Sequence, residues 1–222
     1  MGKYIKVFNT HNEYESYTAS TEFIIPNVSY CENVINQVHY NPYADPYNGH
    51  EYVDLGLPSG TKWAKMNVGA NSETEYGDYY RYGFGATKYE SGQGTYDSKE
   101  TPLPLSADTA AQVMGGQWHL PTQAQCEELI ANTTYEMVTI DGINGCKFTA
   151  SNGNYIFLPN GGEYYNDSSS IISLGYEMDF ISGTPNASPS VMACWGLKSD
   201  GYEPFVSGEK LTSGCNVRGV VG

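Results

Sequence analysis

The chain has 222 residues, of which 25 are acidic and 11 are basic, so its formal net charge is −14. A charge of this sign and size argues against nucleic acid or an anionic membrane surface as the main partner. The 25 glycines, 11 prolines and 20 tyrosines favour short strands joined by tight turns over a helical bundle. At this length we expect one medium-sized domain, or one domain with a small appendage.

Residues 1–48 differ in character from the rest of the chain and are interpreted as a separate N-terminal segment. Residues 4–8 and 23–30 have the composition of short strands, and residues 38–49 are rich in proline and turn formers, which is typical of a linker. The first residues lack the apolar run of a secretory signal, and no run approaches the ~20 apolar residues that a membrane helix needs. We therefore expect a soluble protein whose N-terminal segment packs on the second domain, on a sister chain or on a larger assembly.

The second domain, residues 49–222, is predicted to open with a hairpin. Residues 52–57 alternate as a strand, Pro58-Ser59-Gly60 is a turn sequence, and residues 61–64 return as a second strand. Residues 85–115 are rich in glycine, serine, threonine and proline, with few periodic apolar residues. This composition predicts a long surface loop.

One segment, beginning at Thr122, predicts a helix on several independent grounds. Thr122 can accept a hydrogen bond as the N-cap, and Gln125 can return it, which makes a capping box. Cys126, Leu129 and Ile130 then fall on one apolar stripe. No other segment has so clear a period of 3.6 residues, so the rest of the chain is expected to be strands and loops around this helix.

Strands and turns are predicted after the helix. Residues 135–140 favour a strand, and residues 146–150 and 155–159 flank a turn sequence and so predict a hairpin. Asp141-Gly142 and Asn144-Gly145 are both dipeptides typical of tight turns. From residue 161 onward the chain offers only short apolar fragments between glycine, serine and asparagine.

These motifs, taken in order, resemble the Fibrobacter succinogenes major paralogous domain, which is widespread in Bacteroidota and their phages. The resemblance covers about residues 50–222 and leaves residues 1–48 outside it. It rests on residues 50–64, Glu75-Tyr76-Gly77-Asp78-Tyr79-Tyr80, Trp118-His119-Leu120-Pro121-Thr122, Asn144-Gly145-Cys146-Lys147, Ile156-Phe157-Leu158-Pro159 and Val217-Arg218-Gly219-Val220. His119 stands where the family has arginine, and Gly219 stands where it has proline.

The resemblance implies an α+β domain with a C-type-lectin-like fold, made of short twisted antiparallel strands, one or two helices and long loops. In that fold the first and last strands pair and a loop region forms the upper face. Some relatives are phage or bacterial adhesins whose C-terminal segment is hypervariable, rewritten by diversity-generating retroelements. The helix beginning at Thr122 would then support a variable face elsewhere in the domain.

The sequence carries no motif for catalysis or metal binding. The tripeptide Glu203-Pro204-Phe205 lacks the third oxygen ligand of a calcium-dependent lectin triplet. The five cysteines include no closely spaced pair, and the four histidines are scattered. We therefore expect no catalytic residue, metal or cofactor, and we interpret the cysteines as small buried hydrophobes.

Residues 186–215 are the candidate binding segment, because they place large aromatic and charged side chains among glycine and serine. Aromatic rings give contact area with few rotatable bonds, and small neighbours let them adapt to a partner. For Trp195 and Phe205, packing beneath the loops is an equally open alternative. The predicted ligand-binding residues are Trp195, Lys198, Asp200, Tyr202, Glu203, Phe205, Glu209 and Lys210.

The leading hypothesis is a non-enzymatic receptor- or ligand-binding protein of a phage or prophage virion, such as a tail or head fibre adhesin. Its partner would be a host cell-surface protein or glycan, and residues 1–48 would bind a virion component or drive homo-oligomerisation, with a trimer as one form. It would be soluble inside the cell before assembly into the virion. Two alternatives remain open: a virion decoration protein without a dedicated receptor, and a bacterial cell-surface protein of Bacteroidota.

Overall fold

The computed structural model describes residues 45–186 and 192–222. The chain divides between Ala44 and Asp45, and the unit from Asp45 to Gly222 is described below. The strands expected at residues 4–8 and 23–30 lie outside the described residues. Residues 45–48, which we had assigned to the N-terminal segment, belong to this unit: Trp118 Nε1 donates to the Tyr47 carbonyl at 2.7 Å and the Gln117 N–H donates to the Pro46 carbonyl at 2.8 Å.

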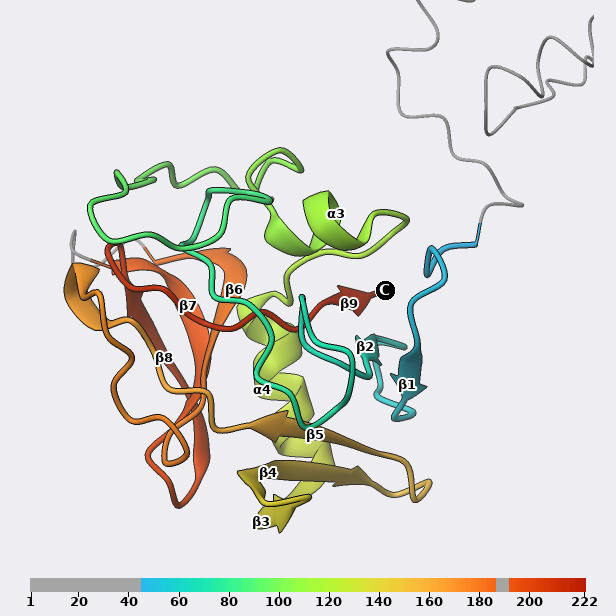
Figure 1. The fold of residues 1–222 in the computed structure, drawn as a ribbon. Coiled ribbons are helices and arrows are strands. Elements are labelled where there is room, and N and C mark those ends of the chain that lie inside the picture. Colours follow the sequence, from blue (N-terminus) through green and yellow to red (C-terminus); the bar gives the residue numbers. More distant parts are fainter. Residues whose placement is uncertain (1–44, 187–191) are drawn as a thin grey trace, which may run out of the picture. The chain divides into compact units, whose positions relative to one another are not determined.

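The described unit combines three small antiparallel sheets with two α-helices (Figure 1). This arrangement is compatible with the predicted α+β class. The sheets, in strand order, are β1 (Tyr52–Asp54), β2 (Lys62–Ala64) and β9 (Val220–Val221); β3 (Thr133–Ile140), β4 (Ile143–Ala150) and β5 (Tyr155–Pro159); and β6 (Asp179–Pro185), β7 (Met192–Ser199) and β8 (Pro204–Lys210).

The first and last strands lie in one sheet, but they are not neighbours. β9 pairs with β2 through Trp63 and Val220, and β1 pairs with the other side of β2. The expectation of direct pairing between the first and last strands was therefore wrong. The hairpin expected at the start of the domain is present, with strands of three residues each.

The predicted helix is α4 (Gln123–Asn132), and its capping box is formed in both directions. The Gln125 N–H donates to Thr122 Oγ1 at 3.2 Å, and the Thr122 N–H donates to Gln125 Oε1 at 2.9 Å. Cys126 and Leu129 are fully buried against the second and third sheets. This prediction is confirmed.

A second helix, α3 (Thr109–Met114), lies inside the stretch predicted to be a surface loop. Ala110 and Met114 are buried in the core beside Trp118, so the end of that stretch is not a surface feature. Gly219 explains the close packing, because a Cβ there would lie 2.7 Å from the Met114 sulfur. The helix has six residues, too few to display a hydrophobic period.

The turn at Asp141-Gly142 is confirmed, since both residues have positive φ angles between β3 and β4. The second predicted turn, Asn144-Gly145, was wrong: both residues lie within β4. Gly145 is there for packing, because a Cβ would lie 2.4 Å from the Phe157 ring on β5. The last third of the chain also forms a regular sheet, β6–β8, where only apolar fragments were expected.

Arg218 fastens the C-terminal segment to the rest of the unit. Its buried guanidinium donates to Asn67 Oδ1 at 2.7 Å, to the Ala64 and Lys65 carbonyls, and to the Phe157 carbonyl at 2.8 Å. One side chain thus connects the first hairpin, the following loop and β5. None of the described helices is long and apolar enough to cross a membrane.

Candidate functional site: the hairpin of β7 and β8

The eight predicted site residues all lie on the hairpin of β7 and β8 or at its tip, but they do not form one cluster. Asp200, Tyr202, Glu203 and Phe205 lie at or next to the tip, and Trp195 and Lys210 lie toward the other end. Pro204 and Lys210 are the two ends of the seven-residue strand β8, which places them about 20 Å apart. The side chains of Lys198 and Glu209 point into the interior of the domain. The structure therefore divides the set into three groups.

The tip of the hairpin is a well-supported turn. Asp200 Oδ1 accepts hydrogen bonds from the backbone N–H groups of Tyr202 at 3.0 Å and Glu203 at 3.1 Å. These two bonds, from Glu203 first, lower the pKa of Asp200. The carboxylate therefore stays ionised and acts as a clamp on the turn, which limits how many conformations the tip can adopt.

Two tyrosines shape the exposed end of this turn. Tyr202 is 75% exposed, and its ring makes an edge contact with the ring of Tyr176, with centroids 6.4 Å apart. Gly201 has φ +86°, and a Cβ there would lie 2.8 Å from the Tyr176 ring. Tyr176 thus packs directly on the turn from a separate loop. We call Tyr176, Asp200, Tyr202 and Glu203 the tip surface.

The remaining surface residues of the predicted set are less exposed. Phe205 is 37% exposed and lies opposite Lys198 in the ladder, one residue into β8. Trp195 is half-buried opposite Gly208. The Lys210 ammonium lies 4.0 Å from the centre of the Tyr165 ring and donates to its hydroxyl, so it is already engaged.

Lys198 and Glu209, two of the predicted ligand-binding residues, instead belong to a buried ion cluster. Lys198 Nζ lies 2.8 Å from Glu209 Oε2, 2.8 Å from Asp179 Oδ1 and 3.9 Å from Glu163 Oε1. Glu209 is only 2% exposed. Alternation in the strands explains this, because Lys198 shares a sheet face with Asp179, its ladder partner on β6.

The cluster places one ammonium among three carboxyl groups, and protonation of carboxyl groups offsets part of the excess negative charge. Burial, and then the charge of Glu209, raise the pKa of Glu163 to about 7. Burial likewise raises the pKa of Asp179 to about 6. Burial alone would lower the pKa of Lys198, but the carboxylates of Glu209 and Asp179 outweigh it and raise that pKa. Lys198 therefore remains charged in the interior.

Glu163, Glu209 and Cys215 are the one group of possible metal ligands among the described residues. The chemistry of the cluster does not favour a metal there. The Lys198 ammonium already lies 2.8 Å from Glu209 and 3.9 Å from Glu163, and it supplies the positive charge that a metal would bring. Burial also raises the pKa of the Cys215 thiol well above its ordinary value, so the thiolate that metals bind is disfavoured.

The described cysteines are structural. Cys126, Cys146, Cys194 and Cys215 are free thiols and all are buried. Burial raises the pKa of Cys194 and Cys215, so neither thiol is activated as a nucleophile. The interpretation of these four residues as small hydrophobes agrees with their positions; Cys31 lies outside the described residues.

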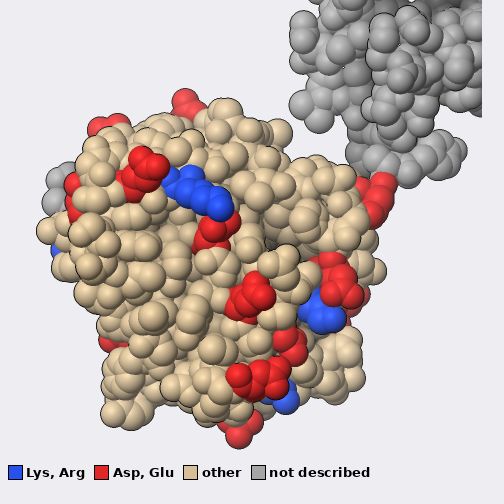
Figure 2. Space-filling model, in the orientation of Figure 1, with Lys and Arg blue, Asp and Glu red and all other residues tan. Residues whose placement is uncertain are grey.

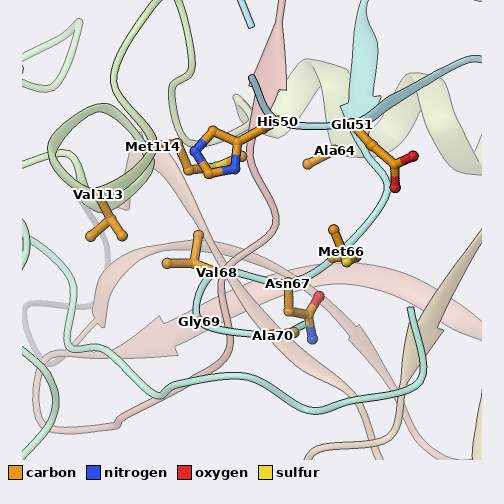
Figure 3. A pocket seen from close by; sticks show the side chains of 10 residues that line it. All are labelled: His50, Glu51, Ala64, Met66, Asn67, Val68, Gly69, Ala70, Val113 and Met114. Carbon is orange, nitrogen blue, oxygen red and sulfur yellow. The ribbon is translucent and has the colours of Figure 1, made fainter. Parts of the chain in front are cut away.

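Two hollows of the described surface lie away from the hairpin. One is a cavity of about 60 Å³ between the first hairpin and α3, where His50 faces Met114 (Figure 3). Pockets for small molecules usually hold ~300 Å³ or more, so this one is too small for a substrate of ordinary size. A shallow depression of about 620 Å³ adjoins it, and its lining includes Tyr47, Tyr52 and Asn154.

Three important residues were missed by the sequence analysis. Tyr176, Asp179 and Glu163 lie outside residues 186–215, and the fold brings them to the hairpin from a loop and from β6. No local pattern marks them, since their roles come from tertiary contacts. On the face seen in Figure 2, acidic side chains outnumber basic ones and are scattered, so no basic patch for a polyanion forms there.

The chain matches no protein-family model, no curated protein and no solved structure.

Proposed function

We propose that residues 45–222 form a non-enzymatic binding domain of the C-type-lectin-like type, which recognises a receptor or ligand through the tip surface. The protein would be a phage or prophage virion adhesin, with a host cell-surface protein or glycan as its partner. Residues 1–44 would attach it to a virion component. The proposal rests on the residues of the tip surface and on the motifs of the second domain.

The observation that carries the proposal is the way Tyr202 is presented. Its ring is three-quarters exposed although the turn beneath it is fixed by two hydrogen bonds to Asp200 and by the ring of Tyr176. An exposed aromatic ring on a pre-organised turn binds with little further loss of conformational freedom. A solubilising loop has no need of either feature.

The chemistry of the tip surface suits a ligand rich in hydroxyl or amino groups. Asp200 and Glu203 are exposed carboxylates beside the two tyrosine rings. Carboxylates accept hydrogen bonds from hydroxyl and amino groups, and aromatic faces cover apolar or cationic surfaces. A neutral or basic glycan, or a basic protein loop, would meet both requirements.

The experiment is direct binding to cells. Labelled full-length protein is incubated with a panel of Bacteroidota strains, and the same protein is tested for its ability to block adsorption of phage. Saturable binding to some strains supports recognition. Incorporation into particles without any binding to cells would instead support the decoration protein.

A further inference from the structure

The outer edge of β3 is an open hydrogen-bonding edge. Among the described residues, β4 is the one strand that pairs with β3, through eight consecutive residue pairs with no bulge. Figure 1 draws β3 at the lower margin of the unit. Edge strands are commonly protected by proline, lysine or a bulge, and β3 has none of these. Its single charged residue is Glu136.

The hairpin turn fixes which groups point outward. Ile140 and Ile143 flank the two-residue turn Asp141-Gly142, so they form a hydrogen-bonded pair. Even-numbered residues of β3 therefore bond to β4, and odd-numbered residues direct their N–H and C=O groups away from it. The outward backbone groups belong to Tyr135, Met137 and Thr139.

Two of these residues, Met137 and Tyr135, carry apolar side chains that are incompletely covered. Met137 is partly buried and packs on the core cluster that includes Cys126 and Leu129 of α4. Tyr135 lies on the same face of the sheet and is 42% exposed. An added strand would extend this inner face and cover both side chains.

We propose that β3 is the interface of a two-fold symmetric dimer, in which β3 of one protomer pairs antiparallel with β3 of its partner. In a two-fold symmetric pair of strands, each residue lies opposite a residue whose side chain points to the same sheet face. The residue numbers of two opposed residues therefore add up to an even number, and this sum defines the register. Charge selects among these registers. A sum of 272 would place Glu136 opposite the partner's Glu136, and sums of 270 or 276 would leave a short overlap.

The register with a sum of 274 meets every requirement. Met137 lies opposite the partner's Met137, and Tyr135 lies opposite the partner's Thr139. All of these residues have outward N–H and C=O groups, so each opposed pair exchanges two backbone hydrogen bonds. The two three-stranded sheets become one sheet of six strands, and each dimer presents two tip surfaces. This dimer does not depend on the proposed function.

Cysteine cross-linking tests the register in the full chain carrying Cys31→Ser. Opposed residues in a hydrogen-bonded pair are ~5.5 Å apart at Cα, which suits a disulfide. Tyr135→Cys and Thr139→Cys should each remain unlinked alone, because each would face the partner's unmutated residue. A mixture of the two single variants should form a disulfide-linked dimer on mild oxidation, and the double variant should link almost completely.

The outcomes separate the alternatives. Light scattering should give the mass of two chains or a multiple of two for the unmodified protein. A monomer mass at all concentrations would overturn the proposal and would fit an edge covered by residues of its own N-terminal segment. Self-linking of either single variant would also overturn it, because that requires another register.

A matched pair of substitutions provides a second test without cysteines. In the proposed register Glu136 lies opposite the partner's Val138. Val138→Lys should tighten the dimer and Val138→Glu should loosen it, with dissociation constants differing by about tenfold or more, since each pair occurs twice. Equal dissociation constants for the two variants would contradict the register.

Discussion

Lys198 donates a 2.8 Å hydrogen bond to Glu209 Oε2 inside the domain, although the two residues lie on the hairpin that also carries the proposed binding tip. Gly196 lies between them on the same sheet face, and Glu209 Oε2 would be 3.8 Å from a Cβ at that position. A Cβ at Gly196 would lie 2.9 Å from the Phe180 carbonyl oxygen, so the glycine lets β6 and β7 approach closely beside this ion pair. The hairpin is therefore fixed from inside while its tip faces outward.

Removing the lysine should destabilise the domain strongly. Lys198→Met leaves three buried carboxyl groups without their cation, and we expect a loss of about 3–5 kcal/mol in the free energy of unfolding, measured by chemical denaturation. Lys88→Met is the control, because Lys88 pairs with Asp78 at 2.9 Å on the surface. That variant should lose no more than about 1 kcal/mol. Equal losses of stability in the two variants would show that the buried ion cluster does not stabilise the domain more than a surface ion pair does.

The cluster should also make stability depend on pH. The pKa of Glu163 is about 7 in the folded protein, above its ordinary 4.5, so the folded state binds more protons between these values. Stability should therefore fall as pH rises from about 4.5 to 7, by up to about 3 kcal/mol for this group. Glu163→Gln should flatten that part of the profile, measured by denaturation at several pH values. An unchanged slope would contradict the raised pKa.

Removing the capping box of α4 should lower the stability of the domain by a smaller amount. Thr122→Ala removes the hydroxyl that accepts from the Gln125 N–H and should lower the free energy of unfolding by about 1 kcal/mol. Thr122→Ser keeps the hydroxyl and should stay close to the natural protein. If the serine and alanine variants were equally destabilised, the loss would come from the threonine methyl group and not from the cap.

Gly201 allows backbone strain to be separated from the contact with Tyr176. Gly201→Ala adds a Cβ at φ +86° that would lie 2.8 Å from the Tyr176 ring. Gly153 has the same φ with no atom within 4 Å of a Cβ, so Gly153→Ala reports the backbone cost alone, about 1 kcal/mol. We expect Gly201→Ala to cost more in thermal unfolding. Equal costs would mean that Tyr176 moves aside freely.

The parts of the fold that were predictable are those encoded by neighbouring residues. The box of Thr122 and Gln125, and the turn at Asp141-Gly142, involve contacts within four residues of sequence, and both formed as predicted. Asn144-Gly145 has the composition of a turn, but the Phe157 ring packs on Gly145 and keeps it in a strand. Tertiary packing overrode the local preference there.

The candidate site was only partly predictable, for the same reason. The exposure of Asp200, Tyr202 and Glu203 follows from their place in a turn. Glu209 was predicted to be a ligand-binding residue, yet it is buried because Lys198 and Asp179 share its sheet face. That face could not be assigned without knowing that residues 179–185 form the adjacent strand.

The measurement that tests the central claim most directly is the binding of the Tyr202→Ala variant to the cells that bind the unmodified full chain. We expect a loss of at least tenfold in affinity with a nearly unchanged melting temperature, because Tyr202 is 75% exposed. Leu105→Ala, at another highly exposed apolar residue, is the control and should bind normally. Unchanged binding by the stable Tyr202→Ala variant would show that the tip surface is not the recognition site.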